Sequence, residues 1–185
     1  MTASRTDREA GMQLLIDEAR TFPARAAAHG VNLGPHTTSA TPQAMFIACS
    51  DAHVVPALLT SSRPGDLYEL RTYGGTLPHY AEHEPTSEAR TIEHAVDVLC
   101  VTDIIVCGHS RCGAIDALHP DSEAAPFQVA AGQWHTLMQF DALSEYPCVQ
   151  ARLIDRTLRL HAWYYDIDAG TTVRYDPRAS AFLPL

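Results

Sequence analysis

Two short apolar runs constrain the fold of this chain more than any other feature. The first is AMFIAC at residues 44–49, and the second is DIIVCGHS at 103–110, which contains three β-branched residues and reaches a glycine. Short continuous apolar runs are typical of strands that are buried on both faces, as in parallel sheets covered by helices. The first run therefore predicts a strand buried on both faces, and the second predicts another strand of the same sheet.

The segments around these runs alternate between helical and extended patterns. The clearest helix is predicted where Ile92, Val96 and Leu99 recur at helical spacing. Helices are expected over four segments: 6–29, 53–61, 87–100 and 127–143. Further strands are expected at DLYEL (66–70) and within 157–176, where two strands joined at DAG form a C-terminal hairpin. This order predicts an α/β fold with a mostly parallel central sheet flanked by helices.

The chain is interpreted as one domain, residues 1–185, that begins with an N-terminal helical arm and linker at 1–41. The linker, GVNLGPHTTSATP (30–42), is rich in Gly, Pro and Thr. Pro23 is expected to kink or end the first helix. A length of 185 residues is enough for one sizeable core.

Composition excludes several classes of function. A formal net charge of −9 argues against a nucleic-acid partner, which needs a basic surface. No window approaches 18 uncharged apolar residues, and the first residues lack an export signal, so we expect a cytoplasmic protein with no membrane partner. The five cysteines are an odd number, which argues against a disulfide framework and favours packed, metal-binding or catalytic thiols.

Candidate metal ligands follow directly on the two apolar runs. Cys49 and Asp51 end the first run, and His109 and Cys112 end the second. In parallel sheets, ligands bind beyond the carboxyl ends of the strands. Two thiolates and one imidazole suit zinc, with a fourth position for water or a carboxylate. The spacing therefore predicts a catalytic type of zinc site.

Several motifs together resemble the β-class carbonic anhydrases. FIACSD matches the family's apolar strand followed by Cys-Ser-Asp-Ser-Arg, and PGDLYELR matches its Pro-Gly-Asp-(apolar)-Arg stretch. IEHAVDVL, DIIVCGHSRCGA and LRLHAWYYDIDAG followed by RYD match in order and spacing. The resemblance extends from about Pro42 to Asp176.

The resemblance implies an activity, a metal and an assembly. The activity is the reversible hydration of carbon dioxide by zinc-bound hydroxide. The zinc ligands would be Cys49, His109 and Cys112, and Asp51 would either accept a hydrogen bond from the bound water or bind zinc itself. The family also forms dimers or higher oligomers in which the N-terminal helix lies on the partner subunit.

Three departures from the family pattern lie around the predicted site. His53 stands where the family has an Arg that holds the Asp, so we hypothesise that Asp51 is less restrained and more often a fourth ligand. RTYGG at 71–75 replaces Arg-Asn-Ala-Gly-Asn, and the family's pocket Gln falls at Ala40. The candidate catalytic residues are Asp51, His53, Arg71 and Tyr73.

Other functions remain open at this point. The same fold could carry a repurposed zinc enzyme for carbon disulfide or carbonyl sulfide, or a lyase or cyclase for a metabolite. A permanently closed site would instead fit a non-catalytic zinc-bound dimer.

Single residues also have purely structural interpretations. Cys49, His109 and Cys112 could be core residues, and Asp51 could cap a short helix. Tyr73 could be a packing residue. Arg71 could pair with a carboxylate across a subunit interface.

Overall fold

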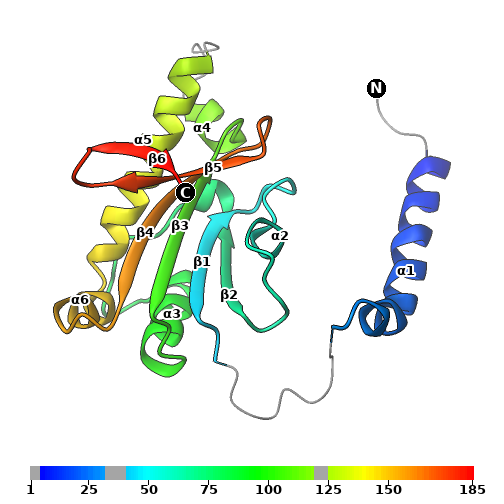
Figure 1. The fold of residues 1–185 in the computed structure, drawn as a ribbon, viewed down its shortest axis with the longest axis horizontal. Coiled ribbons are helices and arrows are strands. Elements are labelled where there is room, and N and C mark those ends of the chain that lie inside the picture. Colours follow the sequence, from blue (N-terminus) through cyan, green and yellow to red (C-terminus); the bar gives the residue numbers. More distant parts are fainter. Residues whose placement is uncertain (1–4, 32–40, 119–124) are drawn as a thin grey trace. The chain divides into compact units, whose positions relative to one another are not determined.

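The computed structural model describes residues 5–31, 41–118 and 125–185, and its centre is a six-stranded sheet (Figure 1). The strands are β1 (Ala44–Cys49), β2 (Leu67–Thr72), β3 (Asp103–His109), β4 (Arg159–Asp166), β5 (Thr171–Asp176) and β6 (Ala181–Pro184). Their order is β2-β1-β3-β4-β5-β6, with β1 to β4 parallel and the last two strands antiparallel. The predicted mostly parallel sheet and C-terminal hairpin are confirmed.

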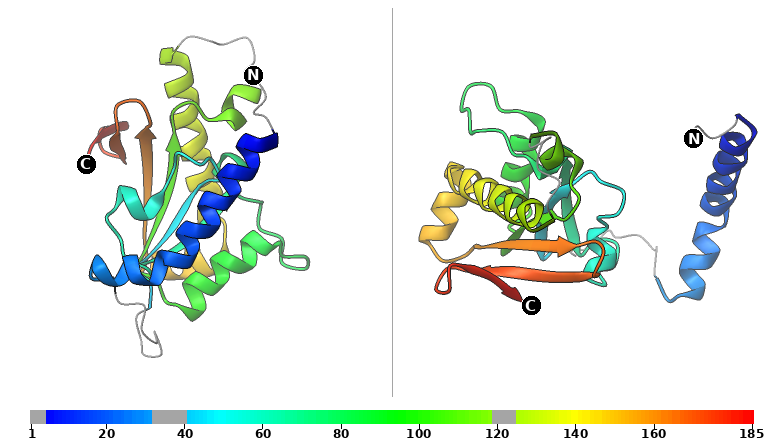
Figure 2. Two further views of the ribbon diagram at one scale, coloured as in Figure 1. Left: turned by 90° about the vertical axis from the view of Figure 1, so that its right-hand side faces the viewer. Right: turned by 90° about the horizontal axis from the view of Figure 1, so that it is seen from above.

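Chain contacts divide the protein into two units, Met1–Ala40 and Thr41–Leu185. In the first unit, α1 (Arg5–Ala28) continues past Pro23, so this proline does not end the helix. Figure 2 shows the helix changing direction toward its C-terminal end, in agreement with the expected kink. The helix exposes several large apolar side chains: Met12, Leu14, Leu15, Ile16 and Phe22. The linker position Ala40 lies outside the described residues.

The helices of the second unit agree with the sequence pattern in part. They are α2 (Pro56–Leu59), α3 (Ser87–Glu93), α4 (Gly113–Leu118), α5 (Ala125–Ser144) and α6 (Pro147–Ile154). Thr86 caps the start of α3, because its hydroxyl accepts a hydrogen bond of 3.2 Å from the Ala89 N–H. α3 then passes into a π-helical turn, η2 (His94–Val98).

Three elements of this unit were not predicted: α4, α6 and β6. α4 and β6 are short, and α6 begins at a proline, which is a favourable first helical position. None of the helices in the described part of the chain is long and apolar enough to cross a membrane.

The two faces of the sheet are both buried, as the continuous apolar runs predicted. Met45 and Ile47 of β1 face a core shared with α3 and α6, whereas Phe46 and Ala48 face a second core that includes Trp163. Successive side chains of a strand point to opposite faces, which explains the division. Figure 2 shows α5 lying along one face of the sheet.

Close packing of α5 fixes the position of the β3 strand end. A Cβ atom on Gly108 would lie 2.0 Å from the Thr136 hydroxyl of α5, and one on Gly132 would lie 2.8 Å from the Tyr164 ring of β4. Both contacts therefore require glycine. The absence of a side chain at Gly108 lets α5 lie directly against β3, the strand that carries His109.

Candidate metal centre

Three potential ligands meet at the carboxyl edge of the sheet. Cys49 ends β1, His109 ends β3, and Cys112 lies one residue before α4. β1 and β3 are adjacent and parallel, with Ala48 opposite Cys107, so their ends meet at one edge. The two sulfurs and an imidazole nitrogen all lie within 4.8 Å of one another, and the three residues are buried.

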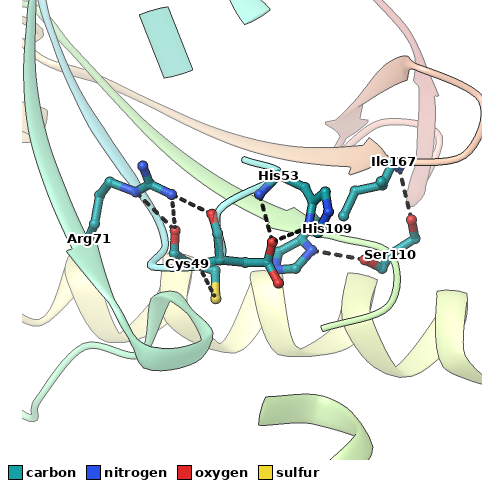
Figure 3. Close-up of polar contacts among 7 residues, drawn as sticks. Cys49, His53, Arg71, His109, Ser110 and Ile167 are labelled. Carbon is teal, nitrogen blue, oxygen red and sulfur yellow. Dashed lines mark hydrogen bonds and ion pairs between the residues drawn. The ribbon is translucent and has the colours of Figure 1, made fainter. Parts of the chain in front are cut away.

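The imidazole of His109 presents an unprotonated nitrogen to this group. Its Nδ1 lies 2.8 Å from the Ser110 carbonyl oxygen, which can only accept, so Nδ1 carries the proton (Figure 3). Within the described structure, Nε2 is buried and has no hydrogen-bond partner. Burial also lowers the pKa of His109 and favours the neutral ring.

The thiols complete a donor set that is typical of a cation site. Burial raises the pKa of Cys112, and the nearby Cys49 raises it further. A bound cation reverses this balance, because it stabilises thiolates directly. All five cysteines are free thiols, as the odd count predicted. Two thiols and a buried, lone-pair-bearing imidazole nitrogen therefore fit zinc.

Asp51 lies on the loop that follows Cys49 and is held by His53. Its Oδ1 accepts a hydrogen bond of 2.8 Å from the His53 N–H and lies 2.9 Å from His53 Nδ1. The backbone hydrogen bond is the main cause that holds the pKa of Asp51 below its usual value, followed by the imidazole contact. The carboxylate thus faces His53 at the position where the family has Arg.

Arg71 and Tyr73 contact the backbone of this centre. Arg71 donates to the Cys49 carbonyl at 3.0 and 3.1 Å and to the Asp51 carbonyl at 2.6 Å (Figure 3). The Tyr73 hydroxyl donates to the Gly113 carbonyl at 3.3 Å, and the residue is largely exposed. Both side chains lie where they can fix the loops that carry the thiols.

Sequence reasoning missed two residues of the centre. His135 of α5 lies with Nε2 3.0 Å from the carbonyl of Gly74 and so ties the turn η1 (Tyr73–Gly75) to the helix. Ser110 holds the His109 ring through its carbonyl. The spacing of His109 and Cys112 indicated only these two residues as ligands and gave no role to Ser110 between them.

Comparisons with known proteins agree with this geometry. A family model described as carbonic anhydrase matches residues 44–134. A carbonic anhydrase from Pseudomonas aeruginosa is 34% identical in an alignment of 176 positions that covers 80% of this chain and 80% of that one. The chain belongs to the β-carbonic anhydrase family. Within that family, the β-carbonic anhydrase CcaA has a similar structure, with 28% identity and a TM-score of 0.86 over 95% of this chain and 92% of that one.

A more distant neighbour supports the fold alone. One of two tetrameric β-carbonic anhydrases from Sordaria macrospora is 18% identical, with a TM-score of 0.72 over 90% of this chain and 96% of that chain. The predicted fold class and family resemblance are thus confirmed. This member of the family is an enzyme of the carbonate dehydratase type.

Proposed function

We propose that the chain is a zinc-dependent hydro-lyase that hydrates carbon dioxide reversibly, with Cys49, His109 and Cys112 as zinc ligands. The observation that carries this proposal is the buried Nε2 of His109, which lies within 4.8 Å of two buried thiol sulfurs and has no hydrogen-bond partner in the part of the chain that the structure describes. A buried polar atom without a partner costs free energy in a purely structural cluster. A metal ion at this point would satisfy all three donors.

The protein's own groups would prepare the site for this chemistry. Zinc, when bound, acidifies a coordinated water and supplies a nucleophile near neutral pH. The Ser110 carbonyl fixes the His109 ring in the tautomer that ligates through Nε2. Arg71 fixes the Cys49 and Asp51 carbonyls and would act as a positioning residue.

Asp51 is the proposed proton acceptor beside the metal. Its carboxylate is kept ionised by the hydrogen bonds from His53, and it follows Cys49 by two residues. The Asp51 N–H also donates to the Cys49 sulfur at 3.4 Å, which stabilises a thiolate. A shift of this carboxylate onto the metal would close the site, so Asp51 is at the same time the candidate fourth ligand.

Two alternative functions also include a bound zinc ion. In one the enzyme acts on a different substrate, and in the other the protein is not catalytic. The replacement of the Arg by His53, together with RTYGG at 71–75, supports the alternative of a repurposed enzyme for carbon disulfide or carbonyl sulfide, or of a lyase or cyclase for a metabolite. A permanently closed site would leave a non-catalytic zinc-bound dimer. We propose carbon dioxide hydration first because Asp51 retains an ionised carboxylate at the family's position.

We further propose a homodimer or higher homo-oligomer in the cytoplasm. Tetrameric assembly is stated for the structurally similar enzymes of Sordaria macrospora. The large apolar side chains that α1 exposes favour contact with a second subunit. Five free thiols are consistent with a reducing compartment.

Stopped-flow measurement of carbon dioxide hydration, with zinc quantified on the same sample, tests the proposal. We expect about one zinc per chain, rapid hydration, and loss of both in Cys49→Ala. The matched control is Cys148→Ala, which removes a half-buried thiol elsewhere in the fold and should retain metal and activity. Stoichiometric zinc without hydration would refute the carbon dioxide reaction, and assays with carbonyl sulfide and carbon disulfide would then separate a repurposed enzyme from a non-catalytic dimer.

A further inference from the structure

We propose that the turn between β4 and β5 (residues 167–170) positions the metal-facing nitrogen of His109, with Ser110 as the connecting residue. The turn belongs to a part of the chain that contributes none of the three ligands. This inference rests on the proposed zinc site and adds a positioning residue to it. Its parts are visible in Figure 3, where Ser110 lies between His109 and Ile167.

The first step is the contact between Ser110 and the imidazole. The Ser110 carbonyl is 2.8 Å from Nδ1 of His109, and among the described residues this is the only hydrogen bond of the ring. Rotation of the Ser110 peptide would therefore turn the ring and move Nε2 away from the two sulfurs. The orientation of the ligand depends on how firmly Ser110 is held.

The second step is the attachment of Ser110 to the hairpin. The Ser110 N–H donates to the Tyr165 carbonyl at 2.9 Å, and its hydroxyl accepts from the Ile167 N–H at 2.9 Å. The hydroxyl also lies 3.5 Å from Oδ1 of Asp166, at the limit of a hydrogen bond. Ser110 is buried, so water does not compete easily for these groups.

The third step is the rigidity of the turn itself. Oδ1 of Asp166 accepts from the N–H groups of Asp168 at 2.9 Å and Ala169 at 3.1 Å, and the Asp166 carbonyl accepts from the Gly170 N–H at 2.8 Å. An aspartate that binds its own following backbone in this way preorganises a turn. The Ile167 N–H is thus presented to Ser110 from a fixed frame.

The backbone between the two ligands needs such an external support. Arg111 has a φ of 56°, a left-handed conformation that is unfavourable for a residue with a side chain. Its guanidinium pairs with Asp168 of the same turn at 2.8 Å. Both side chains are more than half exposed, so this pair contributes little stability on its own. The buried contacts of Ser110 are the principal attachment.

Zinc affinity and a spectroscopic probe of ligand geometry test this inference. Ser110→Ala should weaken zinc binding about tenfold in a chelator competition. This loss is at the low end of the range expected when a residue that supports a metal ligand is replaced. It should also change the visible absorption spectrum of the cobalt(II)-substituted protein. Ser110→Thr keeps the hydroxyl and should preserve both readouts. The matched control is Ser144→Ala, which removes a half-buried hydroxyl that donates to the Phe140 carbonyl in α5.

Two results would overturn the inference. In the first, Ser110→Ala has the same zinc affinity and the same cobalt spectrum as the Ser144→Ala control. In the second, Ser110→Thr loses as much zinc affinity as Ser110→Ala. Nitrogen-15 NMR of the metal-free protein provides an independent readout. It should show the Nδ1-protonated form of His109 in the unmodified chain and a mixture of both neutral forms in Ser110→Ala; unchanged spectra would refute the positioning role. If the unmodified chain binds no zinc, the proposed function fails, and this metal-free comparison still decides the role of Ser110.

Discussion

Each of the two edges of the sheet carries a histidine, and the two differ in whether the protein supplies a hydrogen-bond partner for Nε2. At the amino edge, Asp103 binds Arg159 through two hydrogen bonds of 2.7 and 2.8 Å and lies 2.8 Å from Nε2 of His161. At the carboxyl edge, Nε2 of His109 is buried and has no hydrogen-bond partner among the described residues. One imidazole is satisfied by the protein, and the other is not.

This difference separates a structural cluster from a site. A satisfied network stabilises the fold and needs no ligand. An unsatisfied buried donor set costs folding free energy, which a bound ion would offset. The histidine that lacks a partner is therefore the one to which function should be assigned.

The strongest test of this contrast compares a substitution at one edge with a substitution at the other. Cys112→Ala should reduce bound zinc from about one per chain to nearly none and lower carbon dioxide hydration by more than about 100-fold, because a ligand is lost. Asp103→Asn should leave both values unchanged. Metal analysis and stopped-flow assays on the same samples measure this. A zinc loss in both variants would mean that the edges are not independent.

A second test measures stability at the amino edge. Asp103→Asn removes the charge that Arg159 and His161 bind, and we expect the free energy of unfolding to fall by about 1–2 kcal/mol. The estimate is modest because the Arg159 side chain is 70% exposed. Urea denaturation of metal-free protein gives the value. No change would show that the paired edge is not stabilising.

The same variant predicts a pH dependence. Hydrogen bonds from Arg159 are the main cause that lowers the pKa of Asp103 well below its usual value. The folded state therefore binds fewer protons than the unfolded state, and the stabilisation is present above about pH 4 and is lost as the pH falls through the lower, folded-state pKa. The stability difference between the unmodified chain and Asp103→Asn should shrink on acidification. A difference that grew would contradict this sign.

The smallest expected effect concerns His53. Its side chain is 73% exposed, and it holds Asp51 partly through its backbone N–H, which a substitution retains. His53→Ala should therefore lower hydration only a few-fold, with zinc retained. His53→Arg should exceed the unmodified rate because Arg restores a permanent, two-pronged partner. If His53→Arg fails to raise the rate, His53 is not the main reason for any deficit in hydration.

Sequence patterns were sufficient for β1 to β5 and for the three candidate ligands, because a strand and the residues at its end can be recognised from local order. Two uninterrupted apolar runs predicted buried parallel strands, and parallel strands bring Cys49 and His109 to one edge. Contacts between distant segments were beyond these patterns. Ser110 meets Ile167 across 57 positions, and Asp103 meets His161 across 58, and no spacing rule relates such pairs.

The turn η1 illustrates the same limit at closer range. RTYGG drew attention to Tyr73 as a possible catalytic group, and the structure places its hydroxyl on the Gly113 carbonyl. The anchor of that turn is His135, on a helix that was correctly predicted but whose inward face could not be assigned. Side-chain direction within a correct helix depends on the final packing of α5 against the sheet.

The wide separation of the ligands along the chain sets an order of events during synthesis. Cys49 leaves the ribosome 63 residues before Cys112 (112 − 49), and the turn that holds Ser110 follows more than 50 residues later. A nascent chain therefore exposes single thiols well before the complete centre can form. The complete donor set with its Ser110 support therefore cannot form before residue 167 has been synthesised, so the proposed zinc ion would bind in full geometry only after β1, β3 and β4 are complete.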